Sequence, residues 1–224
     1  MNQTKTIIIG GFALNQLPLT RLINTLNNYY FVDINALPAP FTLEELAQQI
    51  IVQFGQQDSS LKIVAYSCGG LLALKVAELM PKQVKLVILI NSTPCFMQQD
   101  NWQGITYNNL QLLQQRLENF SLQNFLNYFT QLAAQPITLS RNELSYWQSK
   151  YCHQANLDQW LKLIANTDLR TLIPNLISQL IWFNATHDQL IPFPQQNPNT
   201  QILSASSHLE LNSQQLISQI KLYL

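Results

Sequence analysis

Short hydrophobic runs alternate along this chain with segments in which hydrophobic residues recur every three or four positions. Short runs rich in Ile and Val predict buried strands, and the three-to-four spacing predicts helices that pack on them. A threonine at 42 with a glutamate at 45 is the pattern of a capping box that opens a helix. We expect strands at 6–9, 30–34, 61–65, 84–90, 180–184 and 201–203, and helices at 17–28, 42–54, 71–80 and 213–224.

The alternation stops in the middle of the chain. Residues 93–174 hold no convincing strand, and hydrophobic spacing predicts helices at 110–117, 122–132 and 156–165. Strands that alternate with helices predict an α/β fold, with a mostly parallel sheet covered by helices on both faces. We therefore expect a core made of residues 1–92 and 175–224, and a helical insertion at 93–174 that forms a lid over the open ends of the strands.

Composition narrows the class of protein. The chain has 224 residues, enough for one domain with a substantial core, and 47% of them are hydrophobic while 11% are charged. A formal net charge of zero gives no reason to expect nucleic acid or an anionic membrane surface as a partner. The apolar run at 7–9 is too short for a leader or a span, and three cysteines show neither disulfide nor metal spacing. We expect a monomeric cytoplasmic protein with no metal and no organic cofactor.

One serine lies in a context typical of a catalytic nucleophile. Ser67 stands in the sequence Ala-Tyr-Ser-Cys-Gly-Gly at 65–70, between a predicted strand and a predicted helix. A strand, a tight turn with a serine and a helix make the nucleophile elbow of α/β-hydrolases. A serine in such a turn often does no more than cap the helix, but the glycines and the partners below favour a nucleophile.

An acid and a base follow in the order that this fold requires. Asp188 comes after the predicted strand 180–184, and His208 comes after the predicted strand 201–203. Parallel strands would bring both loops to the sheet edge that holds Ser67, where His208 would act as base and Asp188 would orient it. The alternatives fit less well: Asp168 and His153 lie in the insertion, Asp33 comes too early, and His187 precedes the acid in its own loop.

Backbone N–H groups would stabilise the negative charge that develops on the substrate oxygen. The residue after the nucleophile normally supplies one donor, here the N–H of Cys68, with its thiol packed at the start of the helix. The loop 10–13, Gly-Gly-Phe-Ala, follows the first strand and would supply the second donor from the N–H of Phe12. The alternative for this loop is a plain glycine turn.

Five short segments of the chain resemble motifs of one known family of enzymes. The loop IIGGFALN at 8–15 resembles the family's H-G-W-G-L-N oxyanion loop, and the elbow resembles its G-W-S-L-G-G. STPCF at 92–96, followed by WQGI at 102–105, is similar to S-S-P-C-F and W-P-G-I at the entry to the lid. TDLR at 167–170 resembles the V-D-L-R that leads out of the lid. In these motifs the chain resembles the pimeloyl-acyl-carrier-protein methyl ester esterases of biotin synthesis, and the resemblance extends along nearly the whole chain.

The resemblance implies a serine carboxylesterase that hydrolyses the methyl ester of a pimeloyl chain carried on acyl carrier protein. Ser67 would attack the ester carbonyl, His208 would transfer protons, and Asp188 would stabilise the imidazolium. In this interpretation Tyr128, Phe129 and Trp147 line an acyl channel, although aromatic residues on helices fill a lid core just as readily. Candidate contacts to the carrier protein are Arg141, Lys150 and Lys162.

The lid departs from the family in its charge. The family presents several arginines there to an acidic carrier, whereas residues 117–139 contain no Lys or Arg. A general short-chain carboxylesterase or a thioesterase is therefore an alternative that keeps the chemistry and changes the substrate. A hydrolase-like fold used only for binding is a second alternative, and it would be indicated by a broken triad. The elbow also has Ala65 for the family's first glycine, and the oxyanion loop has Gly10 for its histidine.

Overall fold

A six-stranded sheet forms the centre of the computed structural model, which describes residues 4–26, 28–37, 39–55, 60–191, 200–203, 207–209 and 214–224. The strand order is β2-β1-β3-β4-β5-β6, and every neighbouring pair is parallel. The strands are β1 (Thr4–Ile9), β2 (Tyr29–Val32), β3 (Ser60–Tyr66), β4 (Val84–Ile90), β5 (Gln179–Ala185) and β6 (Thr200–Leu203). The mostly parallel sheet expected from the alternating pattern is confirmed.

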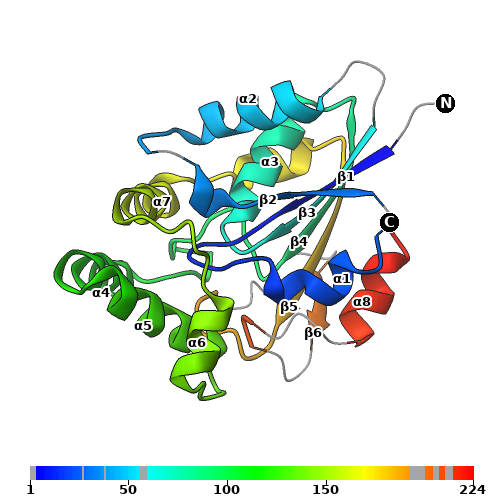
Figure 1. Ribbon diagram of the computed structural model, residues 1–224. Coiled ribbons are helices and arrows are strands. Elements are labelled where there is room, and N and C mark those ends of the chain that lie inside the picture. Colours follow the sequence, from blue (N-terminus) through cyan, green and yellow to red (C-terminus); the bar gives the residue numbers. More distant parts are fainter. Residues whose placement is uncertain are drawn as a thin grey trace.

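Helices cover both faces of the sheet (Figure 1). On one face α3 (Gly69–Leu79) packs against β1, β3 and β4, and α2 (Leu43–Phe54) packs on α3. On the other face lie α1 (Thr20–Ile23) and α8 (Gln214–Lys221), shown in blue and red in Figure 1. Because the central strands are covered on both sides, β1, β3 and β4 are almost entirely hydrophobic where they are buried.

The register of the strands brings several loops to one edge of the sheet. Ile9 pairs with Ala65, and Ile90 pairs with both Tyr66 and Phe183. The carboxyl ends of β1, β3, β4 and β5 therefore lie side by side, and the loops that follow them meet at this edge. In parallel α/β sheets this edge is where ligands bind.

The segment between β4 and β5 contributes no strand to the sheet within its described residues. This helical segment (residues 93–174) contains α4 (Tyr107–Asn119), α5 (Leu122–Ala134), α6 (Arg141–Trp147) and α7 (Gln154–Asn166), with the 3₁₀ helix η3 (Arg170–Asn175) at its end. The four α-helices gather beyond the carboxyl ends of the strands (Figure 1). α4 contacts α5 and α7, and α5 contacts α6.

The two ends of the helical segment are joined to each other. Cys95 and Asp168 form an isolated antiparallel bridge, and the N–H of Leu169 donates to the carbonyl oxygen of Pro94 over 2.9 Å. The indole N–H of Trp102 donates to the carbonyl oxygen of Cys95 over 2.8 Å. The entry and exit motifs that resemble the esterase family therefore form one neck between the sheet and the helices.

Two local predictions differ from the structure. The helix expected at 17–28 is a 3₁₀ turn, η1 (Leu17–Leu19), followed by α1, and it ends at Ile23. The Thr25 hydroxyl donates to the Leu22 carbonyl oxygen over 2.8 Å, and such a local bond from a side chain to the backbone competes with a helix. Helix α6 was not expected, although Ser140 and Glu143 form a capping box at its start. The capping box predicted for Thr42 and Glu45 is confirmed. The start expected for the last helix, Ser213, lies outside the described residues.

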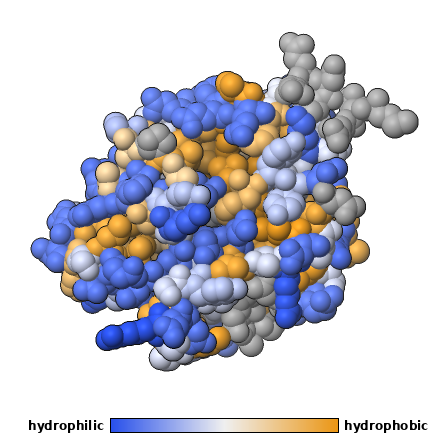
Figure 2. Space-filling view, viewed as in Figure 1, coloured by the Kyte–Doolittle hydropathy of each residue, from blue (hydrophilic) through white to orange (hydrophobic). Residues whose placement is uncertain are grey.

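Hydrophilic residues cover much of the face shown in Figure 2. With so few charged residues, uncharged polar side chains must supply much of this surface. Hydrophobic residues form separate patches, some of them over the helical segment at the left of the view. Single exposed hydrophobic residues are ordinary on a protein surface.

Candidate active site

The turn between β3 and α3 holds Ser67 in a strained conformation. Its φ is 54°, in the left-handed region that a residue with a Cβ rarely adopts. The next turn is packed so closely that a Cβ on Gly69 would collide with the carbonyl oxygen of Gly10, and one on Gly70 would collide with the hydroxyl of Ser92. A serine on a tight strand-to-helix turn flanked by obligatory glycines has the geometry of a nucleophile elbow.

Two further side chains complete a hydrogen-bonded chain with Ser67. The Nε2 atom of His208 lies 3.1 Å from the Ser67 hydroxyl, and its Nδ1 atom lies 2.6 Å from Oδ2 of Asp188. The side chains of His208 and Asp188 are 1% and 2% exposed. With the proton on Nδ1 directed at the carboxylate, Nε2 is free to accept the serine proton. The arrangement can therefore make the serine a nucleophile.

The carboxylate of Asp188 is fixed by its own loop. Its Oδ1 atom accepts hydrogen bonds from the backbone N–H groups of Leu190 at 2.9 Å and Ile191 at 3.0 Å. Together with His208 Nδ1 these give the carboxylate three donors. Such a buried carboxylate is oriented before any substrate arrives, which is what positioning an imidazole requires.

The backbone of His208 is held by two residues that the sequence did not indicate. The hydroxyl of Tyr66 donates to the His208 carbonyl oxygen over 2.9 Å, and the amide of Asn91 donates to the same oxygen over 3.2 Å. Asn91 has φ 44° and its Oδ1 atom accepts the N–H of Ala185 over 2.8 Å. Asn91 thus joins the loops that carry His208 and Asp188. The only feature of the sequence that could have indicated this role is that Asn91 directly follows the buried strand β4, which pairs with the strand before Ser67.

The two backbone N–H groups expected to bind an oxyanion belong to Phe12, which lines the same pocket as Ser67, and to Cys68, the residue after Ser67. Burial raises the pKa of the Cys68 thiol to about 12, while hydrogen bonds from the Phe12 and Cys68 backbones act in the opposite direction. Among the residues that the structure describes, neither N–H has an oxygen acceptor. Both donors therefore stay available beside Ser67.

A narrow hydrophobic pocket opens at Ser67. It is lined by Phe12, Ser67, Phe96, Ile105, Leu110, Leu113, Phe129, Leu161, Ile164, Leu190 and Ile191. Most of these side chains come from the helical segment, so α4, α5 and α7 form its roof. The free volume is about 30 Å³, room for no more than about two water molecules. Any longer apolar ligand requires these side chains to move.

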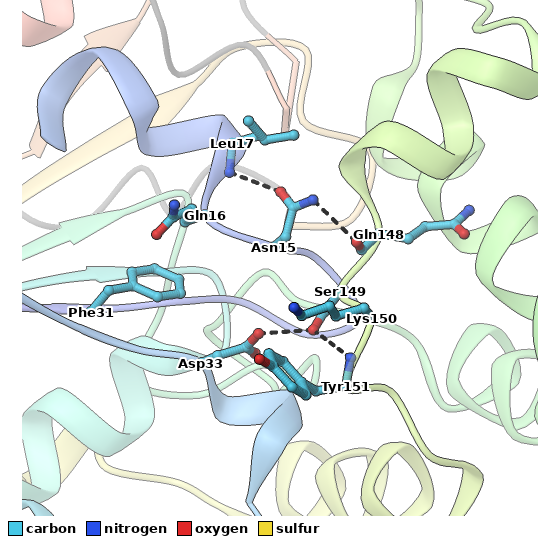
Figure 3. Close-up of a pocket in the computed structure, with 9 residues that line it drawn as sticks. All are labelled: Asn15, Gln16, Leu17, Phe31, Asp33, Gln148, Ser149, Lys150 and Tyr151. Atoms are coloured by element: carbon cyan, nitrogen blue, oxygen red, sulfur yellow. Dashed lines mark hydrogen bonds between the residues drawn. The ribbon is translucent and has the colours of Figure 1, made fainter. Parts of the chain in front are cut away.

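A larger cavity of about 390 Å³ does not include Ser67 (Figure 3). It lies where the loop after β1, the end of β2 and the connection between α6 and α7 meet. Its lining consists of Asn15, Gln16, Leu17, Phe31, Asp33, Gln148, Ser149, Lys150 and Tyr151. Size alone does not identify a reaction site. The candidate nucleophile, Ser67, lines the smaller pocket.

The predicted acyl-channel residues separate in the structure. Phe129 lines the pocket at Ser67 and lies edge-to-face against Phe12, with ring centroids 4.8 Å apart. Tyr128 does not line that pocket, and the guanidinium of Arg116 lies 3.8 Å from its ring centroid. Trp147 ends α6, where its carbonyl oxygen accepts the N–H of Asn15. Sequence spacing could not separate these three because an aromatic residue in a helical segment can equally well fill its core or line a channel.

The candidate carrier contacts are exposed on the helical segment. Arg141 begins α6, Lys150 lines the larger cavity, and Lys162 forms an ion pair with Asp158 over 2.6 Å. Across residues 93–174 five basic side chains are matched by five acidic ones. This part of the molecule therefore has no net positive charge.

The other acids and histidines lie outside the hydrogen-bonded chain. His153 and His187 are exposed, and His153 is the N-cap of α7. Asp168 forms an ion pair with Arg170 over 2.7 Å, and that hydrogen bond lowers the pKa of the Asp168 carboxyl. Asp33 caps the 3₁₀ helix η2 (Ile34–Ala36).

Within the described part of the chain, three or more His, Cys, Asp or Glu side chains nowhere gather as they would around a metal ion. In the same part of the chain, no helix has the length and hydrophobicity needed to cross a bilayer.

The sequence of this chain is similar to those of known proteins. Curated relatives include the pimeloyl-(acyl-carrier protein) methyl ester esterase of Xylella fastidiosa (strain M23), 25% identical over 221 residues, which covers 92% of this chain and 84% of the relative. The protein of the same name from Pectobacterium atrosepticum is 25% identical over 202 residues, covering 84% and 78%.

Solved structures share the whole architecture. An esterase from Exiguobacterium antarcticum superposes with a TM-score of 0.80 at 17% identity, over 99% of this chain and 92% of that one. A bromoperoxidase from Bacillus anthracis has a TM-score of 0.79 at 15% identity, over 99% and 92%. Because one fold carries both names, this likeness concerns the fold alone. The alpha/beta hydrolase fold family matches residues 38–212. This chain therefore belongs to the α/β-hydrolase fold family.

Proposed function

We propose that this chain is a serine carboxylesterase that hydrolyses the methyl ester of a pimeloyl chain carried on acyl carrier protein. As a class, it is a carboxylic ester hydrolase, supported by its family and by the esterase names of its relatives. The observation that carries the proposal is the continuous hydrogen-bonded chain from Ser67 through His208 to Asp188. The relatives' names support the choice of substrate.

In the proposed reaction Ser67 is the nucleophile. Its Oγ attacks the ester carbonyl carbon while Nε2 of His208 takes the hydroxyl proton, and Asp188 stabilises the resulting imidazolium. The N–H groups of Phe12 and Cys68 donate to the oxyanion of the tetrahedral intermediate. The C–O bond to the methoxy group then breaks, and His208 gives its proton to the departing methanol.

Water completes the proposed cycle. His208 takes a proton from a water molecule, and the hydroxide attacks the acyl carbon bound to Ser67. When this second tetrahedral intermediate collapses, the bond to Ser67 Oγ breaks and His208 returns the proton to the serine. The products are methanol and a free carboxylic acid, and no external cofactor is needed for the balance.

The helical segment is the proposed lid. Its helices roof the pocket at Ser67, and the roof side chains are hydrophobic, which suits the methylene chain of a pimeloyl ester. Because the pocket holds only about 30 Å³, the acyl chain enters after the roof has moved. The neck at Cys95 and Asp168 joins the two ends of this lid to each other.

A general short-chain carboxylesterase or thioesterase is the second candidate. The balanced charge of the helical segment favours it, because an acidic carrier protein is attracted by net positive charge. Of the three candidate cations, Lys162 is already paired with Asp158. Arg141 and Lys150 would then have to support docking on their own.

The deciding experiment follows demethylation of purified pimeloyl-carrier methyl ester by mass spectrometry, with wild type beside Ser67→Ala. Methyl loss with wild type only would support both nucleophile and substrate, and Ser67→Ala should lower the rate by at least about 10³-fold. Cleavage of a p-nitrophenyl ester by wild type, with no action on the carrier-linked ester, would favour the second candidate. No turnover of either ester would contradict the proposed function as a whole.

A further inference from the structure

The loop that carries Phe12 has a backbone that needs external support. Ala13, the next residue, has φ 61°, in the left-handed region that a Cβ disfavours. Such a conformation persists only where surrounding contacts determine it. The N–H of Phe12 can aim at a substrate oxygen only if the peptide groups on either side of it are fixed.

The side chain of Asn35 fixes those peptide groups. It is fully buried, and its Oδ1 atom accepts the N–H of Ala13 over 2.8 Å. Its Nδ2 group donates to the carbonyl oxygens of Gly11 and Leu14, each over 3.1 Å. One carboxamide therefore contacts the backbone before and after Phe12. Only an amide offers an acceptor and two donors in so small a volume.

Asn35 is itself held in place by Asp33. The Oδ1 atom of Asp33 accepts both the backbone N–H and the Nδ2 group of Asn35, each over 2.9 Å. The carbonyl oxygen of Asn35 accepts the amide of Asn156 from α7 over 3.1 Å. The carboxamide therefore keeps one orientation, with Oδ1 toward Ala13.

The connection between α6 and α7 completes this network of hydrogen bonds. The hydroxyl of Ser149 donates to Oδ2 of Asp33 over 2.8 Å (Figure 3), and the N–H of Ser149 donates to the carbonyl oxygen of Ala13 over 3.0 Å. Ala13 is thus bonded through its N–H to Asn35 and through its carbonyl to Ser149. The helical segment and the sheet core hold the same residue from two sides.

We propose that Asn35, held by Asp33 and through it by Ser149, is a positioning residue that fixes the oxyanion loop so that the Phe12 N–H faces the reacting carbonyl at Ser67. The inference rests on the proposed function, because it concerns the transition state of ester hydrolysis. Asn35 does not touch the substrate. Its effect reaches the reaction through the backbone of residues 11–14.

Two substitutions test the carboxamide. Asn35→Ala removes all three bonds to the loop, and Asn35→Asp keeps the volume but replaces both donor hydrogens by an acceptor. We expect kcat for a p-nitrophenyl ester to fall about 10–100-fold, less than the 10²–10³-fold typical of losing a donor outright, with KM changed less than about threefold. Protonation of the introduced carboxylate recovers one donor, so the Asn35→Asp rate relative to wild type should rise as the pH is lowered.

Inhibitor binding distinguishes positioning from a general structural effect. A trifluoromethyl ketone forms a tetrahedral adduct with the serine and uses the oxyanion donors, whereas an alkane chain in the hydrophobic pocket has no oxygen for them. We expect the inhibition constant of the ketone to rise by the same factor by which kcat/KM falls, with inhibition by a short linear alkane unchanged. Asn119→Asp is the matched control, because exposed Asn119 donates one bond to the Gln115 carbonyl far from the loop.

The outcomes separate the two proposals. An inactive wild type contradicts the proposed function, whereas an active wild type with unchanged kcat in a folded Asn35 variant overturns the positioning role. Because Asn35 is buried, both variants can fail to fold. Ser149→Ala then tests the hydrogen-bond network by removing the hydroxyl that donates to Asp33. A matched fall in kcat/KM and in ketone affinity supports the proposal, and wild-type values for both overturn it.

Discussion

Tyr66 and His208 are joined by a buried hydrogen bond in which the tyrosine hydroxyl donates to the histidine carbonyl oxygen over 2.9 Å. Their rings also lie close, with centroids 5.0 Å apart. Tyr66, directly before Ser67 in the chain, therefore holds the backbone of His208, whose ring is hydrogen-bonded to Ser67. Burial, followed by the charge of Asp188, raises the pKa of Tyr66, so the hydroxyl keeps its proton and remains a donor.

Tyr66→Phe should weaken the site without destroying it. The change removes one donor, while Asn91 still donates to the same carbonyl oxygen. A single hydrogen bond contributes about 1 kcal/mol, which corresponds to at most about a fivefold fall in kcat. Steady-state kinetics with a p-nitrophenyl ester and urea unfolding would measure both effects. A larger loss of activity with unchanged stability would mean that the hydroxyl has a direct part in the reaction.

The acyl pocket should respond to the size of residue 113. Leu113 lines the pocket from α4, whereas Leu112, beside it, is 41% exposed. Leu113→Phe fills space that a long acyl chain needs, so kcat/KM for a hexanoyl ester should fall roughly 10-fold or more relative to the acetyl ester. Leu112→Phe is the control and should leave that ratio unchanged. Equal losses for both esters would place the acyl chain elsewhere.

Much of this fold is readable from the sequence because its signals are local. Buried parallel strands are continuous hydrophobic runs, so the prediction of 84–90 matches β4 at both ends. The segment 17–28 contains several Asn and Thr residues, which favour local bonds to the backbone such as that of Thr25, and its helix ends at Ile23. Ser67, Asp188 and His208 are readable as candidates because each follows a strand whose end is fixed by the topology.

The roles of the residues that support the site could not be predicted from the sequence. Asn35, Tyr66 and Asn91 look like ordinary strand-end residues, and their roles depend on partners brought close only by the folded sheet. Asn35 bonds a loop more than 20 positions away, and Tyr66 bonds a carbonyl 142 positions away. No short motif encodes such contacts. Predicting them requires the register of β1, β2 and β3 together with the path of the loops.

Carrier recognition should depend on few charges. If carrier protein docks on the helical segment, Lys150→Glu and Arg141→Glu should each lower kcat/KM for the carrier-linked ester, by roughly 3–10-fold at low salt, with less effect at high salt. Turnover of a free p-nitrophenyl ester should not change. Lys85→Glu is the control, because Lys85 lies near the start of β4, at the opposite edge of the sheet. Equal effects of all three changes would indicate general electrostatics rather than a docking face.

The three cysteines should be unreactive in the folded protein. Burial is the main cause that raises the pKa of each thiol, to about 12 for Cys68 and Cys152. Only the thiolate reacts, and at pH 8 a pKa of about 12 leaves about 10⁻⁴ of the thiol ionised. We expect Ellman's reagent to label all three cysteines in urea and none in the native protein. Fast native labelling would show that these sites open.

The same shifts predict lower stability at alkaline pH. A thiol whose pKa is raised on folding stays protonated in the folded state while the unfolded chain ionises near pH 9. Its contribution is complete below pH 9 and is lost as the pH rises toward 12, by about 1.4 kcal/mol per pH unit for each such thiol. Urea unfolding at pH 8.5, 9.5 and 10.5 would measure the slope. Because tyrosines also titrate there, the test is the difference from Cys152→Ala, whose slope should be shallower; equal slopes would mean that Cys152 does not keep its proton.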